Sequence, residues 1–287
     1  MISLDNVIIG ASGQLGTALS ERLTASGTVV TGTFSHNPVP GLTRLDITDR
    51  EGVRTFFAEN KPRTAILAAC LTNVDYCELN RDKARRVNVA GTKNVADACK
   101  EQGTRLVFIS TYYVFDGRKK TYTESDQTHA INFYGKTKID GERITAALPG
   151  SLIIRACKIY SKGEDDRNFA VRTLAALKKG ETVKVARDQV NNPIEAGMLA
   201  DIILSLIGKG ATGLYHAGGT ENISNYDFAL LLAETSGMDT GLIVPVDTSS
   251  LKQAAKRPLH CCLDISRLRS SIKIKIPTIA ESLKVNK

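Results

Sequence analysis

Residues 6–33 read NVIIGASGQLGTALSERLTASGTVVTGT, and this stretch decides the fold. The apolar run Asn6–Gly10 predicts a strand, and Thr28–Thr33 predicts a second one. Between them, leucine and alanine residues at helical spacing predict a helix that begins at Gln14 and stops at Gly27. A strand, a helix and a second strand in this order form the βαβ unit with which a parallel sheet begins.

Three glycines, Gly10, Gly13 and Gly16, lie in the turn between the first strand and the helix. Gly10 permits a tight turn, Gly13 lets the backbone approach a pyrophosphate, and Gly16 allows the helix to pack closely on the strand. The N-terminus of the helix offers free N–H groups and a partial positive charge to an anion. We therefore expect a dinucleotide to bind here, although a plain glycine-rich turn would show the same residues.

Apolar runs and amphipathic stretches continue to alternate along the chain. Further strands are predicted at Thr64–Ala69, Arg105–Ser110 and Ser151–Arg155; helices are predicted over 49–60, with Thr48 as the N-cap, and over Ala84–Glu101, ended by Gly103. After Arg155 the pattern is less regular, with helices expected near Phe169–Lys178, Met198–Ile207 and Tyr226–Glu234, and strands at Thr182–Val185 and Gly213–His216. We expect an α/β protein with a Rossmann-type, doubly wound parallel sheet in residues 1–155. Residues 156–287 would form a smaller, mixed substrate-binding lobe, and some of its strands would return to the main sheet.

Composition argues against several classes of protein. No apolar run reaches the roughly 20 residues of a membrane span, and the N-terminal residues do not resemble a signal peptide. The net charge of +8 suits anionic partners, but no Lys/Arg run with interleaved aromatic residues predicts nucleic-acid binding. The cysteines show neither a CxxC pair nor a metal-ligand spacing; they are Cys70, Cys77, Cys99, Cys157, Cys261 and Cys262. We expect a cytoplasmic protein with reduced thiols, no bound metal and no membrane partner.

The end of the second strand bears on which cofactor binds. An NAD enzyme often places a carboxylate there for the ribose 2′-hydroxyl, whereas this chain has Thr33-Phe-Ser-His36. Without a carboxylate to repel a 2′-phosphate, NADP is favoured, and NAD stays possible. Asp46 and Ile47 follow a third strand-like position and could bracket the adenine; the alternative is an ordinary helix cap and a core contact.

Tyr134 and Lys138 are four residues apart on a predicted helix running to Ala147, so they share one helix face. A lysine so placed can lower the pKa of the phenol and bind the ribose hydroxyls of a nicotinamide nucleotide. The phenol can then donate a proton to a carbonyl oxygen. Ser110-Thr111 ends the preceding strand at the carboxyl edge of the sheet, where Thr111 can hydrogen-bond the same oxygen. These three residues predict a reductase site; the alternative is a tyrosine on the helix surface.

Taken together, the motifs resemble those of the extended short-chain dehydrogenase/reductase family and, more narrowly, of the dTDP-4-dehydrorhamnose reductases. The matching stretches run through nearly the whole chain: GASGQLG, LDITD, LTNVDYCE, VNVAGT, STYYVFDG, YTESD, NFYGKTK with DGE, DQVNNP and KRP. The resemblance implies reduction of a 4-keto group on a nucleoside-diphosphate deoxysugar, with hydride from the nicotinamide and a proton from Tyr134. It places this reaction in nucleotide-sugar and polysaccharide biosynthesis.

The resemblance also implies roles for individual residues. Tyr134, Lys138 and Thr111 would be catalytic, with Tyr134 and Lys138 also touching the cofactor. The substrate would meet Thr111, Tyr112, Tyr113 and Lys158. The remaining cofactor-binding residues would be Gly10, Ser12, Gly13, Gln14, Leu15, Gly16, Asp46, Ile47, Ala69, Cys70, Leu71 and Thr72.

Three departures from the family pattern concern the sugar pocket. The family usually reads STDYVF, and here Tyr112 stands where the aspartate is expected. Lys158 occupies the place of a substrate-facing tryptophan in the stretch that the family reads as RTSWVYG, and Leu67 stands where an asparagine is usual. Lys158 would bind a polar or anionic group of the substrate, or it would point into solvent.

Two other functions stay open at this stage. The chain is also similar to the regulatory β subunit of methionine adenosyltransferase, a non-catalytic subunit that keeps a nucleotide site. An epimerase of the same fold would hold its NAD tightly and show no net oxidation. A homodimer is a further open expectation.

Overall fold

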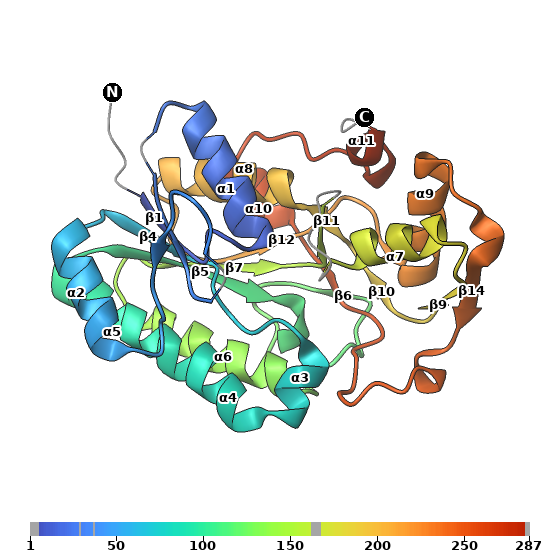
Figure 1. The fold of residues 1–287 in the computed structure, drawn as a ribbon, viewed down its shortest axis with the longest axis horizontal. Helices are drawn as coiled ribbons and strands as arrows, with labels where there is room; N and C mark the ends of the chain where they lie inside the picture. Colours follow the sequence, from blue (N-terminus) through green and yellow to red (C-terminus); the bar gives the residue numbers. More distant parts are fainter. Residues whose placement is uncertain (1–5, 29, 37, 162–167, 285–287) are drawn as a thin grey trace.

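The computed structural model describes residues 6–28, 30–36, 38–161 and 168–284. Its centre is a seven-stranded sheet in the order β12-β7-β5-β4-β1-β2-β3, in which every neighbouring pair is parallel (Figure 1). In chain order the strands are β1 (Asn6–Ile9), β2 (Val30–Phe34), β3 (Thr43–Arg44), β4 (Thr64–Leu67), β5 (Arg105–Thr111), β7 (Leu152–Ala156) and β12 (Gly213–Ala217). The predicted α/β fold with a parallel sheet is confirmed.

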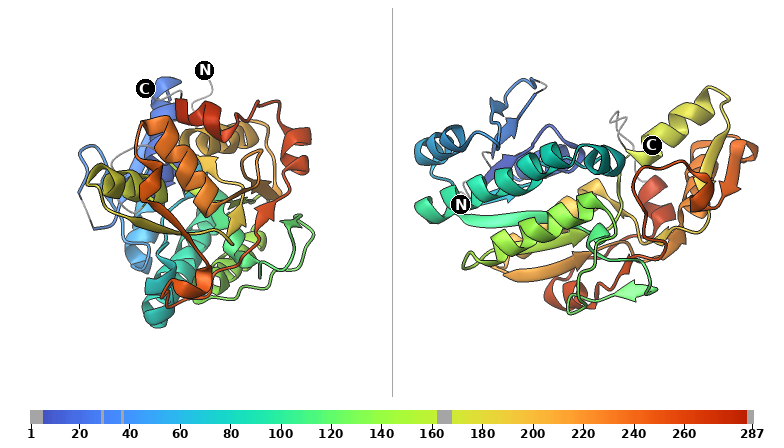
Figure 2. Two further views of the ribbon diagram at one scale, coloured as in Figure 1. Left: turned by 90° about the vertical axis from the view of Figure 1, so that its right-hand side faces the viewer. Right: turned by 90° about the horizontal axis from the view of Figure 1, so that it is seen from below.

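Helices cover both faces of this sheet (Figures 1 and 2). On one face lie α1 (Gln14–Ala25), α8 (Ala196–Gly208) and α10 (Ser266–Ser271). On the other lie α2 (Arg50–Asn60), α5 (Thr92–Gln102) and α6 (Phe133–Ala146). Each face thus has its own apolar core, as a doubly wound sheet requires.

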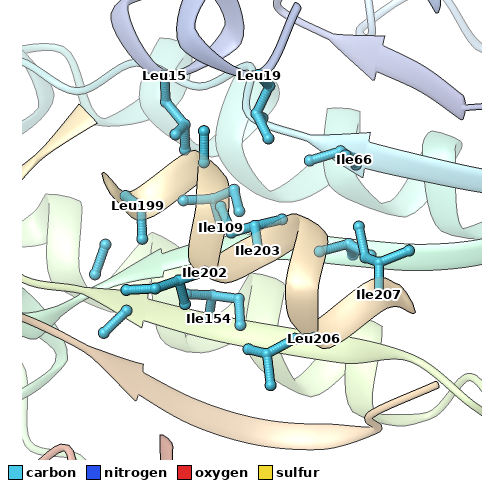
Figure 3. Packing of buried hydrophobic residues seen from close by; sticks show 14 of the residues in the cluster. Leu15, Leu19, Ile66, Ile109, Ile154, Leu199, Ile202, Ile203, Leu206 and Ile207 are labelled. Carbon is cyan, nitrogen blue, oxygen red and sulfur yellow. The ribbon is translucent and has the colours of Figure 1, made fainter. Parts of the chain in front are cut away.

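The larger core is built around α8. Leu199, Ile202, Ile203 and Leu206 recur at helical spacing, are fully buried, and pack towards α1 and the sheet (Figure 3). Burying one such side chain contributes roughly 1.5–3 kcal/mol. This packing fixes α1, and with it the glycine turn that precedes the helix.

Two details of the predicted helices were wrong. Asp49, and not Thr48, is the N-cap of α2: Asp49 Oδ1 accepts a hydrogen bond from Gly52 N at 3.1 Å. The Thr48 backbone N and hydroxyl both donate to Asp46 Oδ1, each at 2.9 Å, so the Thr48 side chain is held at Asp46. The helix expected over Ala84–Glu101 is divided into α4 (Arg81–Arg85), a π-helical turn (Arg86–Gly91) and α5.

The π-helical turn has a local purpose. It carries Asn88, which accepts a hydrogen bond from Leu71 N at 2.8 Å and donates to Leu71 O and Thr137 Oγ1, each at 3.1 Å. Such turns are frequent at functional sites. Here the turn ties the segment after β4 to helix α6.

The remaining elements gather beyond the carboxyl ends of the strands (Figure 1). They include the helices α3 (Val74–Leu79), α7 (Phe169–Lys178), α9 (Asn225–Ser236) and α11 (Ile279–Lys284). Short strands pair as β6 (Thr121–Tyr122) with β15 (Cys262–Leu263), β8 (Ile159–Tyr160) with β11 (Ile194–Glu195), β9 (Val183–Ala186) with β14 (Ile243–Val246), and β10 (Val190–Asn191) with β13 (Ile223–Ser224). Because β12 and α8 belong to the main sheet and its covering layer, the division of the chain at residue 155 stays a proposal.

Across the described ranges, no helix combines the length and apolar character that crossing a bilayer would take.

Candidate active site

A cavity of about 860 Å³ opens at the carboxyl ends of β1, β4, β5 and β7. This edge is where ligands bind in open parallel sheets. The cavity brings together nearly all the predicted site residues: Gly10, Ser12, Gly13, Gln14, Leu15, Gly16, Asp46, Ile47, Ala69, Cys70, Leu71, Thr72, Thr111, Tyr112, Tyr113, Tyr134 and Lys158. Lys138 is the exception, because its side chain is not part of the lining.

The glycine turn has the geometry of a phosphate cradle. Gly10 has φ +92°, and a Cβ there would lie 2.7 Å from Ala69 N. A Cβ on Gly16 would lie 2.2 Å from Gly10 O, whereas a Cβ on Gly13 would meet only Gly10 O, at 3.4 Å. Gly10 and Gly16 are therefore required by the packing of the turn. Gly13 is not, which leaves its open side for a ligand.

Helix α1 begins at this turn without a side-chain cap, since its N-cap is Gly13. The first-turn N–H groups of the helix are therefore available to an anion, and they carry the positive end of the helix dipole. Gln14 Nε2 donates to Ser161 Oγ at 3.0 Å, which brings the segment after β7 to the same turn. The turn fits a dinucleotide pyrophosphate.

Two contacts position the first turn of α6, which carries Tyr134. Asn132 Oδ1 caps α6 by accepting from Gly135 N at 2.9 Å. Gly135 packs so tightly on the turn after β5 that a Cβ would lie 2.1 Å from Tyr113 O. This contact sets the first turn of α6 against the end of β5, so that Tyr134 and Thr111 line the same cavity.

Burial is the largest cause of the pKa shifts of Tyr134 and Lys138. It raises the pKa of Tyr134 well above the usual phenol value, and the hydrogen bond from Thr111 opposes this rise. Burial also lowers the pKa of Lys138, against the opposing effects of Cys70 and Glu142. The Lys138 ammonium lies 4.0 Å from the centroid of the Phe108 ring, on the core side of α6. This cation–π contact explains why Lys138 is not in the cavity lining.

A buried network behind Lys138 was missed by the sequence analysis. Glu142, one helical turn after Lys138, accepts hydrogen bonds from Ser110 Oγ and from the Arg155 guanidinium. Arg155 Nη1 lies 3.4 Å from His216 Nε2. The signal that could have revealed this network was the DGE stretch, which places an acid four residues after the lysine on one helix face.

Asp46 and Ile47 lie at the end of the cavity nearest β2, together with His36 and Arg86. Burial raises the pKa of Asp46, but the hydrogen bonds from Thr48 and the charges of His36 and Arg86 outweigh it, so the pKa is lowered. Asp46 is therefore a carboxylate at neutral pH. Thr33, in β2, and His36, two residues after the end of β2, also line this end of the cavity.

Tyr112, Tyr113 and Lys158 lie towards the other end of the cavity. The Tyr113 ring is 4.5 Å from the Tyr112 ring and meets Tyr134 edge-on at 5.8 Å, measured between ring centroids. Lys158 donates to Asn225 Oδ1 and lies 4.4 Å from the centroid of the Phe169 ring. The aspartate and tryptophan positions of the family pattern are thus occupied by a buried phenol and a half-buried cation.

A family model described as the RmlD substrate binding domain matches residues 5–286. This chain belongs to that family. It is 33% identical over 284 residues to a dTDP-4-dehydrorhamnose reductase of Aggregatibacter actinomycetemcomitans, an alignment covering 94% of this chain and 93% of the relative. It is also 33% identical over 262 residues to a dTDP-4-keto-6-deoxy-D-glucose reductase of Streptomyces niveus, covering 90% and 87%.

A solved relative has the same fold throughout. The dTDP-4-dehydrorhamnose reductase of Bacillus anthracis, determined in complex with NADP, superposes with a TM-score of 0.91 at 31% identity, covering 99% of this chain and 98% of that one. The resemblance inferred from the motifs is confirmed: the chain is a member of the dTDP-4-dehydrorhamnose reductase family within the extended short-chain dehydrogenases/reductases.

Proposed function

We propose that this protein is an NADP-dependent oxidoreductase that reduces the 4-keto group of a nucleoside-diphosphate deoxysugar. One observation carries the proposal: Thr111 and Tyr134 line the same cavity as an uncapped glycine turn. The names of the relatives, which are reductases of dTDP-linked 4-keto sugars, support this substrate class.

Each group has a role in this proposal. When bound, NADPH supplies the hydride for the carbonyl carbon. Tyr134 donates its proton to the carbonyl oxygen, and Thr111 hydrogen-bonds the same oxygen. The raised pKa of Tyr134 keeps the phenol protonated until the reaction begins.

Lys138 supplies positive charge on the same helix face and contacts the ribose hydroxyls. Its long, flexible side chain reaches the cavity by rotating away from the Phe108 ring. The positive charge then favours the phenolate left on Tyr134 after proton transfer.

The cofactor grip in this proposal combines the glycine turn with residues along the sheet edge. Gly13, Gln14 and Leu15 hold the pyrophosphate, and Asp46 and Ile47 contact the adenosine. Ala69, Cys70, Leu71 and Thr72 line the path between them, while Tyr112, Tyr113 and Lys158 face the sugar. A cytoplasmic location and a homodimer belong to the same proposal.

A screen of nucleotide-linked 4-keto sugars with NADPH tests the function, with turnover followed at the nicotinamide absorbance. We expect oxidation of NADPH with at least one dTDP-linked 4-keto-6-deoxysugar. Failure of every sugar, with NADPH still bound, would contradict the proposal and favour a regulatory nucleotide-binding subunit. Co-purification with a larger synthetase would then identify the partner.

A further inference from the structure

Lys158 is a half-buried cation that forms no ion pair with a carboxylate among the residues that the structure describes. Its ammonium donates to Asn225 Oδ1 and lies over the Phe169 ring. An amide oxygen and an aromatic ring attract a cation, but neither neutralises it. Among the ion pairs formed by described residues, none includes Lys158.

The Asn225 amide is itself held in position by neighbouring side chains. Asn225 Oδ1 also accepts from Asn191 Nδ2 at 3.0 Å, and Asn225 Nδ2 donates to Gln189 Oε1 at 2.9 Å. Lys158 is therefore anchored on a rigid polar support through one of its three N–H donors. Its remaining donors stay available to a ligand in the cavity.

A second cation, Arg172, follows Phe169 by three residues on α7, so the two share a helix face. Arg172, on α7, lines the same cavity and contributes to lowering the pKa of Lys158. Burial is the largest cause of that shift, which brings the pKa to about 8. Two neighbouring cations repel each other, so an anion between them would relieve both the repulsion and the cost of burial.

Lys158 and Arg172 lie on other elements than the remaining cations of the described cavity lining. Among the described residues, the other Lys and Arg side chains of the cavity lining are Lys83 and Arg86, which belong to α4 and the π-helical turn. The charge of Arg86 lowers the pKa of Asp46 at the adenosine end. Lys158 instead follows β7 by two residues, and the last residue of β7, Ala156, is level with Thr111 in the sheet. Lys158 therefore lies near the end of β5 that carries Thr111.

We propose that Lys158 and Arg172 form an anion subsite that binds a negatively charged group of the nucleotide-sugar substrate. The group is either the diphosphate or an acidic substituent on the sugar, and both present anionic oxygens of the same chemistry. The inference rests on the proposed function, because it takes the substrate to be a nucleotide sugar. If the acidic substituent is the ligand, the preferred substrate is a sugar acid and not a neutral deoxysugar.

The test uses matched ligands that differ only in the carboxylate. Titration calorimetry measures the dissociation constants of dTDP-glucose, dTDP-glucuronic acid and dTDP with the NADPH-loaded protein, and the uridine series is measured beside them. NADPH and these 4-hydroxy sugars do not react, because the mixture holds no oxidant. The variants are Lys158→Met, Arg172→Met and Lys158→Arg, with Lys178→Met on the same helix as the control.

The expected result for Lys158→Met and Arg172→Met is a loss of at least about tenfold in affinity for an anionic ligand, with Lys158→Arg and Lys178→Met near wild type. A loss confined to the sugar acid identifies the carboxylate as the ligand. An equal loss for both sugars and for dTDP identifies the diphosphate. Either result supports the subsite, provided that thermal melting shows the variants to be folded.

Two results would overturn it. In the first, Lys158→Met and Arg172→Met bind every ligand with an affinity within about twofold of the Lys178→Met control. The other is an equal loss of NADPH affinity, which would assign the pair to the cofactor. Neither depends on turnover: reduction of a neutral 4-keto sugar by a protein that fails this test would leave the proposed function intact.

Discussion

Arg155 and Glu142 form a two-point ion pair in the interior, with Nε 2.9 Å from Oε1 and Nη2 2.7 Å from Oε2. Their side chains are only 5% and 10% exposed. The pair joins β7 to α6, and Ser110 of β5 donates to the same carboxylate. Since Glu142 follows Lys138 by one turn and Ser110 precedes Thr111, the pair supports helix α6 and the end of β5 together.

Replacing Glu142 with Gln should destabilise the fold strongly. Removing one partner of a buried ion pair leaves the other charge without compensation, which typically costs about 3–5 kcal/mol. Urea unfolding of wild type and Glu142→Gln measures this cost. Asp247→Asn is the matched control, because it breaks the exposed Arg187–Asp247 pair and should leave the free energy of unfolding nearly unchanged. Similar losses in both variants would contradict the assignment.

Replacing Tyr134 with Phe should abolish turnover while the affinity for NADPH stays nearly unchanged. The substitution removes the proton donor, whereas the phosphate grip lies at the glycine turn. Initial rates with the best sugar from the substrate screen, together with fluorescence titration of NADPH, measure the two effects. Activity within a few-fold of wild type would show that another group donates the proton.

Replacing Lys138 with Met should reduce both activity and NADPH affinity, because one ammonium serves both. Lys136→Met is the matched control: Lys136 lies on the same helix two residues away and is exposed. We expect the control to keep both properties. Loss of activity with unchanged NADPH affinity would mean that the ammonium acts on Tyr134 without touching the ribose.

The last two glycines of the turn, Gly13 and Gly16, should respond differently to alanine. A Cβ on Gly16 would lie 2.2 Å from Gly10 O and 2.6 Å from Ala11 Cα, both backbone atoms, so Gly16→Ala should lower the melting temperature and weaken NADPH binding. Gly13→Ala meets only Gly10 O at 3.4 Å, so it should melt like wild type and still bind NADPH poorly. Thermal melting with and without NADPH separates the two. Tight NADPH binding by Gly13→Ala would place the pyrophosphate elsewhere.

The repeating units of the fold could be predicted because their signals are local. The strands and helices around the glycine turn follow from apolar spacing and from Gly27, whose φ of +73° ends α1 as expected. The cap of α2 does not follow from the sequence in the same way, because Thr48 and Asp49 are both favoured N-cap residues. The Thr48 hydroxyl donates to Asp46 Oδ1, a contact that capping preferences alone do not reveal.

The candidate site could be predicted only in part, for a physical reason. The turn and the tyrosine–lysine pair are compact motifs, each within one segment. The surroundings of Lys158 come instead from α7 and α9, through Phe169 and Asn225, and no periodicity links such distant segments. Asn88 shows the same limit: its contacts to Leu71 and Thr137 depend on a π-helical turn that the pattern did not reveal.

His216 should make the protein sensitive to mild acid. The side chain lies on β12 and is fully buried; burial first, and then the charge of Arg155, lower its pKa from 6.5 to about 3. Below pH 6.5 the unfolded chain therefore binds a proton that the folded protein does not, so the free energy of unfolding falls as the pH drops from 6.5 towards 3.

At about pH 5 this difference in proton binding should cost about 2 kcal/mol relative to about pH 7.5. His216→Gln removes the titrating group, so its free energy of unfolding should fall by about 2 kcal/mol less between the same two pH values. Urea unfolding of both proteins at the two pH values measures the difference. The comparison does not depend on how stable the variant is at neutral pH, because each protein is its own reference. Equal acid losses in wild type and variant would contradict a lowered pKa for His216 in the folded protein.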